Sequence, residues 1–109
     1  MDTLSKNDEQ VLVTILKLGE NAYGVTIRRQ IQETTGKVYG YGTLYSALNQ
    51  LVRRRLVVKI TGDPKPEKGG RRKYFYRLTK LGAHALKKAQ AAHSLLWNGI
   101  TEAGLDMIQ

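Results

Sequence analysis

Apolar residues recur at three- and four-residue spacing near the start of the chain, which predicts a first helix with one buried face. These positions are Val11, Leu12, Ile15 and Leu16. Ser5 can cap this helix, with Asp8 at the third helical position, close to the positive end of the helix dipole. The segment Gly19-Glu20-Asn21 is expected to end the helix.

Two further helices are predicted, and a short turn separates them. The second runs from about Gly24 to Thr35, and Gly36 is suited to a left-handed cap at its end. Its narrow apolar stripe consists of Tyr23, Ile27 and Ile31. The third begins after Tyr41-Gly42, with Gly42 or Thr43 as its cap, and runs to Arg54. Its apolar positions are Leu44, Leu48 and Leu51 on one edge and Tyr45 and Val52 on the other.

The pattern then changes from helical to alternating, which predicts a strand. The two alternating sets are Leu56, Val58 and Ile60, and Val57, Lys59 and Thr61. Both prolines of the chain fall in the next segment, Gly62 to Gly70, whose composition is that of a loop. A second strand is predicted at Tyr74-Phe75-Tyr76-Arg77-Leu78, so the region forms a β-hairpin.

The end of the chain is expected to form one helix with a seam for dimerisation. Thr79 can cap this helix, and apolar or small residues then follow in alternating steps of four and three, as in a heptad repeat. The eight seam positions are Gly82, Leu86, Ala89, His93, Leu96, Ile100, Ala103 and Met107. Gly99 and Gly104 each cost about 1 kcal/mol of helix propensity, so the last third of the helix is the least favoured.

The order of elements predicts a mainly α fold with a small β-hairpin (α+β). We expect residues 1–78 to form one unit of three helices and the hairpin, and residues 79–109 to form a C-terminal dimerisation helix. A chain of 109 residues that is 41% hydrophobic supports one small core, so burial between two copies would add stability.

Several absences narrow the class of protein. The chain has no cysteine, which excludes disulfides, thiolate zinc sites and cysteine nucleophiles and agrees with a reducing cytoplasm. It has no run of eighteen apolar residues, and its first residues are polar, unlike a signal sequence. We therefore expect a cytoplasmic protein with no membrane partner.

Enzymatic chemistry finds no support in the sequence. His84 and His93 lie nine residues apart on one predicted helix, which is not metal-ligand spacing, and neither has a carboxylate at a useful offset. No Ser-His-Asp set and no phosphate-binding Gly-x-x-x-x-Gly-Lys loop is present. We expect no catalytic residue, no metal and no cofactor.

Positive charge is concentrated in one third of the chain. Net charge is +9, but residues 53–88 alone hold thirteen Lys or Arg against two acids, or +11. The remaining residues hold five basic and seven acidic side chains, or −2. A basic block of this kind attracts nucleic-acid phosphates through the release of counterions.

The third helix is the best candidate to read bases in the major groove of DNA, braced by the second helix. Its exposed side carries no acid and offers Ser46, Asn49, Gln50, Arg53 and Arg54. Asn and Gln side chains pair with the adenine edge, and Arg pairs with guanine. The alternative is an ordinary solvated amphipathic helix. The basic hairpin that follows argues against this alternative.

The hairpin tip is strongly basic. Its cations are Lys65, Lys68, Arg71, Arg72 and Lys73. Such crowding is self-repulsive unless an anionic partner relieves it, and Gly69 and Gly70 would let the backbone approach a phosphate closely.

The chain resembles the PadR-like family of bacterial regulators. The resemblance lies in Tyr23-Gly24-Val25-Thr26-Ile27, in Tyr41-Gly42-Thr43-Leu44-Tyr45 with Leu48 and Leu51, and in the stretch from Gly70 to Thr79 with Gly82. It implies a winged helix-turn-helix protein, usually a repressor, that dimerises through its C-terminal helix. The short form of the family, with a single C-terminal helix, is the most similar.

The resemblance and the patterns together define the expected sites. The residues expected to bind double-stranded DNA are Tyr23, Tyr41, Thr43, Tyr45, Ser46, Asn49, Gln50, Arg53, Lys68, Gly70, Arg71, Arg72 and Lys73. Those expected at a homodimer interface are Leu86, Ala89, His93, Leu96 and Ile100. The chain departs from many relatives at Ser46, where they have Pro, and at Arg55, where they have Gly. Arg55 must therefore make the turn from helix to strand without the freedom of glycine.

A small-molecule site is a further expectation from the resemblance. In drug-sensing relatives, a tryptophan on the last helix flanks a pore at the dimer interface and stacks on planar compounds. Trp97, the only tryptophan, lies beside the seam about one turn later than in those relatives, and His93 is its neighbour. The resemblance thus implies a site for a planar aromatic inducer, whereas the residues alone favour the simpler interpretation that Trp97 packs in the dimer interface.

Two other functions stay open on the sequence alone. One is a basic RNA-binding or ribosome-associated module, against which the long seam argues, because it predicts dimers and two-fold DNA sites. The other is a protein-interaction module without a nucleic-acid role, against which the +11 block argues.

Overall fold

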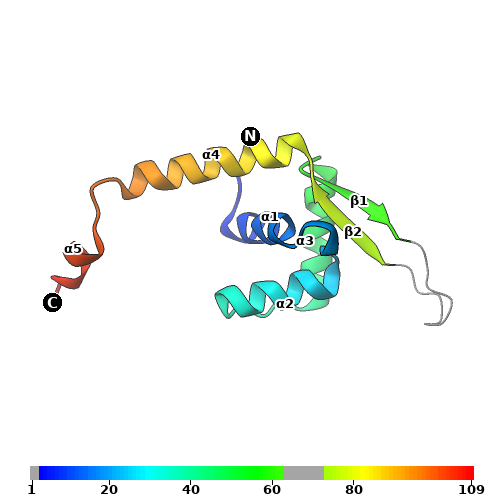
Figure 1. Ribbon diagram of the computed structural model, residues 1–109, viewed down its shortest axis with the longest axis horizontal. Coiled ribbons are helices and arrows are strands. Elements are labelled where there is room, and N and C mark those ends of the chain that lie inside the picture. Colours follow the sequence, from blue (N-terminus) through cyan, green and yellow to red (C-terminus); the bar gives the residue numbers. More distant parts are fainter. Residues whose placement is uncertain (1–2, 63–72) are drawn as a thin grey trace.

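The computed structural model describes residues 3–62 and 73–109, and Figure 1 shows their arrangement. The elements are α1 (Lys6–Leu18), the 3-10 turn η1 (Gly19–Asn21), α2 (Gly24–Thr35), α3 (Tyr41–Arg53), β1 (Val57–Thr61), β2 (Tyr74–Leu78), α4 (Lys80–Trp97) and α5 (Glu102–Asp106). The predicted class, mainly α with one β-hairpin, is confirmed. Among the described residues no helix is both long and apolar enough to cross a membrane.

Three cap signals in the sequence act as predicted. The Ser5 hydroxyl accepts a hydrogen bond from the Asp8 amide at 3.0 Å, and the Asp8 carboxylate accepts one from the Ser5 amide at 3.2 Å. Gly36 ends α2 in the left-handed conformation, with φ at 76°. The Thr79 hydroxyl starts α4 by accepting a hydrogen bond from the Gly82 amide at 3.0 Å.

The start of α3 differs from the prediction. The helix begins at Tyr41, with Gly40 as its N-cap, and Gly42 and Thr43 lie inside its first turn. The first helical hydrogen bond runs from the Leu44 amide to the Gly40 carbonyl at 2.9 Å. Gly40 has no side chain to accept a hydrogen bond from the helix, so the sequence carried no polar cap signal at this point.

The hairpin is antiparallel, with a register that runs from Val57 opposite Leu78 to Thr61 opposite Tyr74. Strand β2 also pairs on its other edge, because the Tyr76 amide donates to the Ala22 carbonyl at 2.9 Å. The segment before α2 therefore ties the hairpin to the helical body. The predicted loop lies outside the described residues from position 63 onward.

One core joins the three helices and the hairpin. Its fully buried side chains come from every one of these elements: Val11, Leu12, Ile15, Ile27, Ile31, Leu44, Leu48, Leu51, Leu56, Val57 and Tyr76. Leu16, expected on the buried face of α1, is 62% exposed, so that prediction is wrong. The core covers the side of α1 that includes Thr14, which is 5% exposed, and Leu16 lies beyond its opposite edge.

The turn between α3 and β1 places a non-glycine residue in the left-handed region, as the sequence required. Arg55 has a φ of 63°. Its amide donates to the Val52 carbonyl at 2.9 Å, and the Leu56 amide donates to the Leu51 carbonyl at 3.0 Å. The Thr79 hydroxyl holds the same turn by donating to the Arg55 carbonyl at 2.7 Å.

Helix α4 starts against the body and then leaves it (Figure 1). A Cβ atom at Gly82 would collide with the Leu56 carbonyl oxygen, so only glycine permits this close approach. Ala85 and Leu86 pack against the core, whereas every residue from 91 to 109 is exposed. We call residues 91–109 the arm and the remainder of the described chain the head.

The arm is not the single helix that the seam predicted. Helix α4 ends at Trp97, Gly99 has a φ of 85°, and a new helix starts with Thr101 as its cap. The prediction of one helix to Met107 is therefore wrong. The chain leaves the helix at Asn98, which has a ψ of 128°, and the left-handed Gly99 completes a turn closed by the Ile100 amide donating to the Trp97 carbonyl at 2.9 Å. The seam positions Ile100, Ala103 and Met107 consequently lie outside α4.

Candidate nucleic-acid interface

The exposed side of α3 gathers the polar residues expected to read DNA. The buried stripe of Leu44, Leu48 and Leu51 faces the core and fixes which side of the helix faces solvent. On that side the exposed residues are Thr43, Ser46, Asn49, Gln50 and Arg53. No acidic residue belongs to this helix, so the surface suits the acceptor-rich edges of bases and the phosphates that flank them.

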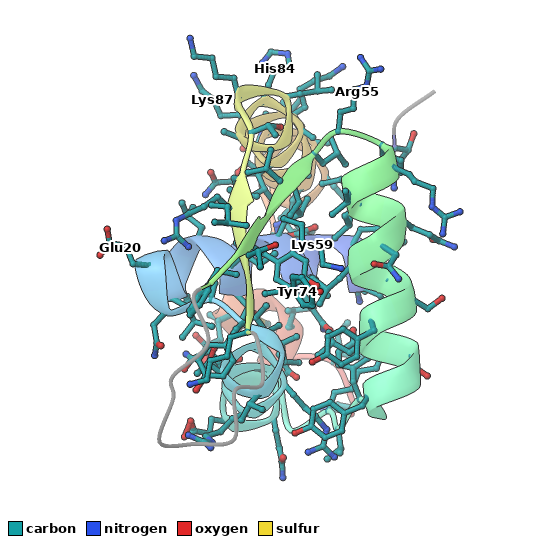
Figure 2. The ribbon with its side chains drawn as sticks, turned by 90° about the vertical axis from the view of Figure 1, so that its right-hand side faces the viewer. Glu20, Arg55, Lys59, Tyr74, His84 and Lys87 are labelled. Atoms are coloured by element: carbon teal, nitrogen blue, oxygen red, sulfur yellow. The ribbon has the colours of Figure 1, made fainter. Side chains whose placement is uncertain are left out.

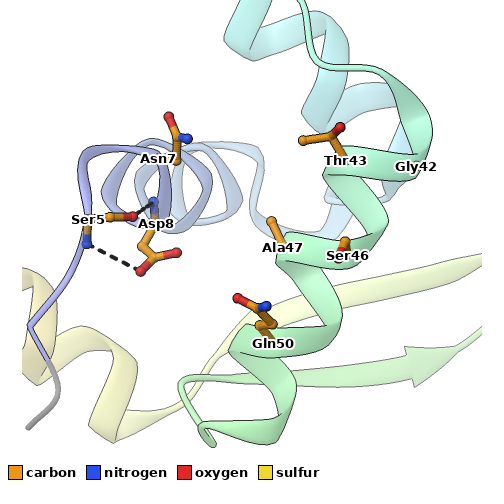
Figure 3. Close-up of a pocket in the computed structure, with 8 residues that line it drawn as sticks. All are labelled: Ser5, Asn7, Asp8, Gly42, Thr43, Ser46, Ala47 and Gln50. Atoms are coloured by element: carbon orange, nitrogen blue, oxygen red, sulfur yellow. Dashed lines mark hydrogen bonds between the residues drawn. The ribbon is translucent and has the colours of Figure 1, made fainter.

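This surface has two flanks. Asn49 and Gln50 are successive residues, about 100° apart around the helix, so they cannot face the same base pair in the same way. Gln50 lines a pocket of about 500 Å³ between α3 and the N-terminal end of α1, together with Thr43 and Ser46 (Figure 3). The other lining residues are Ser5, Asn7, Asp8, Gly42 and Ala47. Asn49 lies toward the opposite flank.

Arg54, which the sequence placed among the exposed groups, has a partner within the head. Its guanidinium forms an ion pair with the Asp8 carboxylate at 3.0 Å and donates to the Thr3 carbonyl at 3.4 Å. The end of α3 is thereby tied to the start of α1. No local pattern indicates this pair, because the two residues are 46 positions apart.

Two tyrosines form the flank of α3 that faces α2 and the hairpin. The Tyr41 and Tyr45 rings are stacked, with centroids 6.2 Å apart and an interplanar angle of 22°. They remain 42% and 40% exposed, so they are accessible beside the reading surface. A Cβ atom at Gly24 would collide with the Tyr45 hydroxyl, which explains why α2 begins with glycine.

Basic residues of the hairpin lie over tyrosine rings. The Lys59 ammonium is 4.1 Å from the centre of the Tyr74 ring, and Figure 2 shows both side chains between the strands and α3. The Lys73 ammonium is 4.6 Å from the centre of the Tyr23 ring, whose edge contacts Phe75. Each contact orients a cation on the hairpin. Sequence reasoning missed Lys59, although the strand alternation puts it on the same side as Tyr74 and Tyr76.

Tyr76 sits beneath this surface and is 1% exposed. Burial raises the pKa of its hydroxyl, and the neighbouring Tyr45 and Tyr74 raise that pKa further. These three side chains come from α3 and β2, so their proximity joins the reading helix to the hairpin. The Tyr76 hydroxyl is neutral at physiological pH.

The other expected DNA contacts belong to the segment of the chain that joins the two strands. Lys68, Gly70, Arg71 and Arg72 lie outside the described residues, and Lys73 is exposed immediately before β2. The basic residues between positions 53 and 88 do not all lie on one surface. Arg55 and Lys87 lie at the α4 end of the head in Figure 2, away from Tyr74.

The residues expected at a dimer or ligand site divide between head and arm. Leu86 packs against the core of its own chain, and Ala89 is partly buried. Leu96 is 77% exposed, and Ile100 lies in the turn between α4 and α5. The His93 and Trp97 rings are 5.9 Å apart, and Trp97 is 46% exposed. Among the described residues, no group of three or more acidic or histidine side chains could hold a metal ion.

A helix-turn-helix of α2 and α3, followed by a two-stranded wing, defines a winged helix-turn-helix protein. The model of the transcriptional regulator PadR-like family matches residues 11–88, well over half of the chain. The chain therefore belongs to the PadR-like family of transcriptional regulators. None of the curated proteins compared matches this chain.

Solved structures share this fold. A PadR family transcription regulator from hypervirulent Clostridium difficile is 28% identical, over 81% of this chain and 88% of that one, with a TM-score of 0.65. A transcriptional regulator from Clostridium thermocellum is 24% identical, over 94% of this chain and 92% of that one, with a TM-score of 0.68. RosR of H. salinarum is 22% identical, over 91% and 82%, with a TM-score of 0.69.

The family assignment settles the class of function. The protein is a DNA-binding regulator of transcription and not an enzyme. The alternative RNA-binding module therefore loses its support.

Proposed function

We propose that the protein is a repressor that binds a pseudo-palindromic operator as a homodimer and is released by a planar aromatic inducer. The observation that carries this proposal is the contrast between a polar, acid-free reading helix and an apolar arm. In this mechanism the dimer covers the operator and blocks RNA polymerase sterically, in the cytoplasm.

The arm supports the homodimer. Four of its large apolar side chains are largely exposed within the described chain: Leu95 and Leu96 are each 77% exposed, and Met107 and Ile108 are 80% and 77% exposed. Water-exposed apolar surface of this extent at one end of a small protein typically marks an interface. A second copy supplies the same surface, and two-fold symmetry makes it self-complementary.

The head supports recognition of DNA. In the proposed complex α3 enters the major groove, where Ser46, Asn49 and Gln50 contact base edges and Arg53 contacts bases or phosphates. Tyr23, Tyr41 and Tyr45 flank the groove and contact the backbone. Lys59 and the wing from Lys68 to Lys73 contact phosphates or enter the minor groove. A dimer then meets half-sites about one helical turn of DNA apart.

Trp97 supports the inducer. Its ring is half-exposed beside the His93 ring, so a flat ligand can stack on it at the interface between two copies. Regulation requires that the ligand prefer one dimer geometry, because a ligand with equal affinity for both shifts nothing. Operator and inducer must then weaken each other's binding by the same factor.

The test of the dimer compares two aspartate substitutions on α4. Leu96→Asp should give a monomer near 12.2 kDa in sedimentation equilibrium at micromolar concentration, and should lose most operator affinity. Ser94→Asp adds the same charge two positions away, on another face of the helix, and should stay dimeric. A wild-type protein that remains monomeric would refute the homodimer.

The test of the inducer uses the single tryptophan. Planar cationic dyes and phenolic acids are titrated with and without operator DNA, and Trp97 fluorescence is recorded. An inducer should quench the fluorescence. Operator DNA should weaken inducer binding by the same factor with which the inducer weakens operator binding. Quenching that DNA does not affect would mean that Trp97 only packs in the interface.

A further inference from the structure

Arg28 on α2 holds both residues that flank the start of α3. Its Nε atom donates a hydrogen bond to the Tyr39 carbonyl at 2.6 Å. Its guanidinium carbon lies 4.6 Å from the centre of the Tyr41 ring. Tyr39 immediately precedes the N-cap Gly40, and Tyr41 is the first residue of α3. One half-buried guanidinium therefore spans the cap of the reading helix.

The start of α3 needs such support, because its own residues do not fix it. Within the described residues no side chain caps the helix by a hydrogen bond. Gly40 and Gly42 both have wide backbone freedom, so the chain could begin its helix at more than one residue. The sequence pattern alone pointed to Gly42 or Thr43, two or three positions after the observed cap.

The other end of the contact is rigid. Tyr39 is 4% exposed, and its hydroxyl oxygen lies 3.1 Å from Asn7 Oδ1 and 3.0 Å from Gln10 Oε1 on α1, two acceptors that share its single proton. On the far side of Arg28, the Tyr41 ring stacks on Tyr45. The guanidinium thus links a fixed point on α1 to the first turn of α3.

We propose that Arg28 is a positioning residue for DNA recognition, which sets the start and orientation of α3 through Tyr39 and Tyr41. The proposal rests on the proposed role of α3 as the reading helix. It requires the planar shape and the Nε donor of the guanidinium as well as its charge. Lysine has the charge but neither of the other two, so it cannot replace arginine in a stacked, hydrogen-bonded site.

The experiment compares Arg28→Lys, Arg28→Met and the matched control Arg29→Met, which removes a charge from the next, exposed position of α2. Affinities for operator and for random DNA are measured over a salt series. Both Arg28 variants should lose discrimination by about 5- to 150-fold, the value of one good bidentate base contact, with an unchanged salt slope. Arg29→Met should keep the discrimination.

The opposite result identifies a phosphate contact. Suppose that Arg28→Lys retains operator binding and that Arg28→Met lowers the slope of log affinity against log salt by about 0.9. The side chain then acts through its charge on DNA, and the proposal is wrong. Unchanged discrimination in both variants would also overturn it.

Hydrogen exchange in the DNA-free protein tests the positioning role of Arg28 independently of the proposed role of α3 in DNA binding. Arg28→Lys should speed exchange of the Leu44 and Tyr45 amides in the first turn of α3, while amides in the middle of α1 exchange as in the wild type. If α3 does not bind DNA at all, this measurement still decides whether Arg28 holds the helix. Equal exchange rates in variant and wild type would refute the positioning role.

Discussion

The head and the arm differ in the burial of their apolar side chains. In the head, three helices and a hairpin enclose a core that contains every fully buried large side chain of the described residues. In the arm, side chains of the same kind, from Leu95 to Ile108, remain exposed. The two regions therefore differ in how much of their apolar surface their own chain covers. The head is stabilised by contacts within one chain, whereas in the proposed dimer the arm would be covered by a second copy.

The largest expected effect comes from one change made in both regions. Leu48 is completely buried, so Leu48→Ala should cost about 2–5 kcal/mol of the free energy of unfolding. Leu96→Ala should cost less than about 0.5 kcal/mol in the monomer, because its side chain is exposed there. Urea unfolding should be measured at concentrations where sedimentation shows monomers. Equal losses would mean that the arm folds against its own head.

The exposed side of the head should govern sequence preference instead of stability. Asn49→Ala and Gln50→Ala should each relax discrimination by about 1–3 kcal/mol, and at different base positions, because the two side chains lie on different flanks of α3. Selection of operators from random DNA measures this directly. An operator motif that is the same for wild type and both variants would exclude direct readout by these amides.

A smaller effect concerns the turn that leads from α3 into the wing. Arg55 adopts a left-handed conformation that costs a non-glycine residue about 1–2 kcal/mol, whereas glycine adopts it freely. Arg55→Gly should therefore raise the free energy of unfolding by about 0.5–1 kcal/mol, after the greater backbone entropy of glycine is subtracted. Arg55→Ala is the control, since it removes the side chain but keeps Cβ. Equal stabilities of the two variants would contradict this account.

The smallest expected effect is on the free energy of unfolding at alkaline pH. The pKa of Tyr39 is raised by burial and by nearby Asp8, and the pKa of Tyr76 is raised by burial and by neighbouring tyrosines. Because the unfolded chain releases these protons first, their contribution to stability is complete below about pH 10 and declines as the pH rises further.

Ultraviolet absorbance of phenolate tests this prediction. Tyr39→Phe and Tyr76→Phe should each remove absorbance only from the last part of the alkaline titration. Absorbance lost from the first part would show that these hydroxyls are not protected by burial.

The sequence predicted those features that depend on neighbouring positions along the chain. Ser5, Gly36 and Thr79 act as caps because a cap involves residues only three or four positions away. The break after Trp97 escaped the heptad pattern because that pattern records apolar spacing, whereas the break depends on the backbone conformations of Asn98 and Gly99. Apolar residues continue on both sides of the break, so the pattern does not change there.

The missed parts of the site depend on residues far apart in sequence. Asp8 with Arg54 joins the start of α1 to the end of α3, and Arg28 with Tyr39 joins α2 to the segment before α3. Nothing in the local pattern distinguishes these arginines from solvated ones. Leu16 shows the same limit for the core, since its exposure depends on where the other helices lie.

Helix α4 connects the two regions as a stiff rod. Its first turn is joined to the base of the wing, because the Thr79 amide donates to the Leu56 carbonyl at 3.0 Å and Gly82 lies against the same carbonyl. Eighteen residues of helix span about 27 Å, so a tilt of about 10° moves the far end by about 5 Å. In the proposed dimer, a change in how two arms meet would therefore correspond to only a small rotation of α4 at the base of the wing.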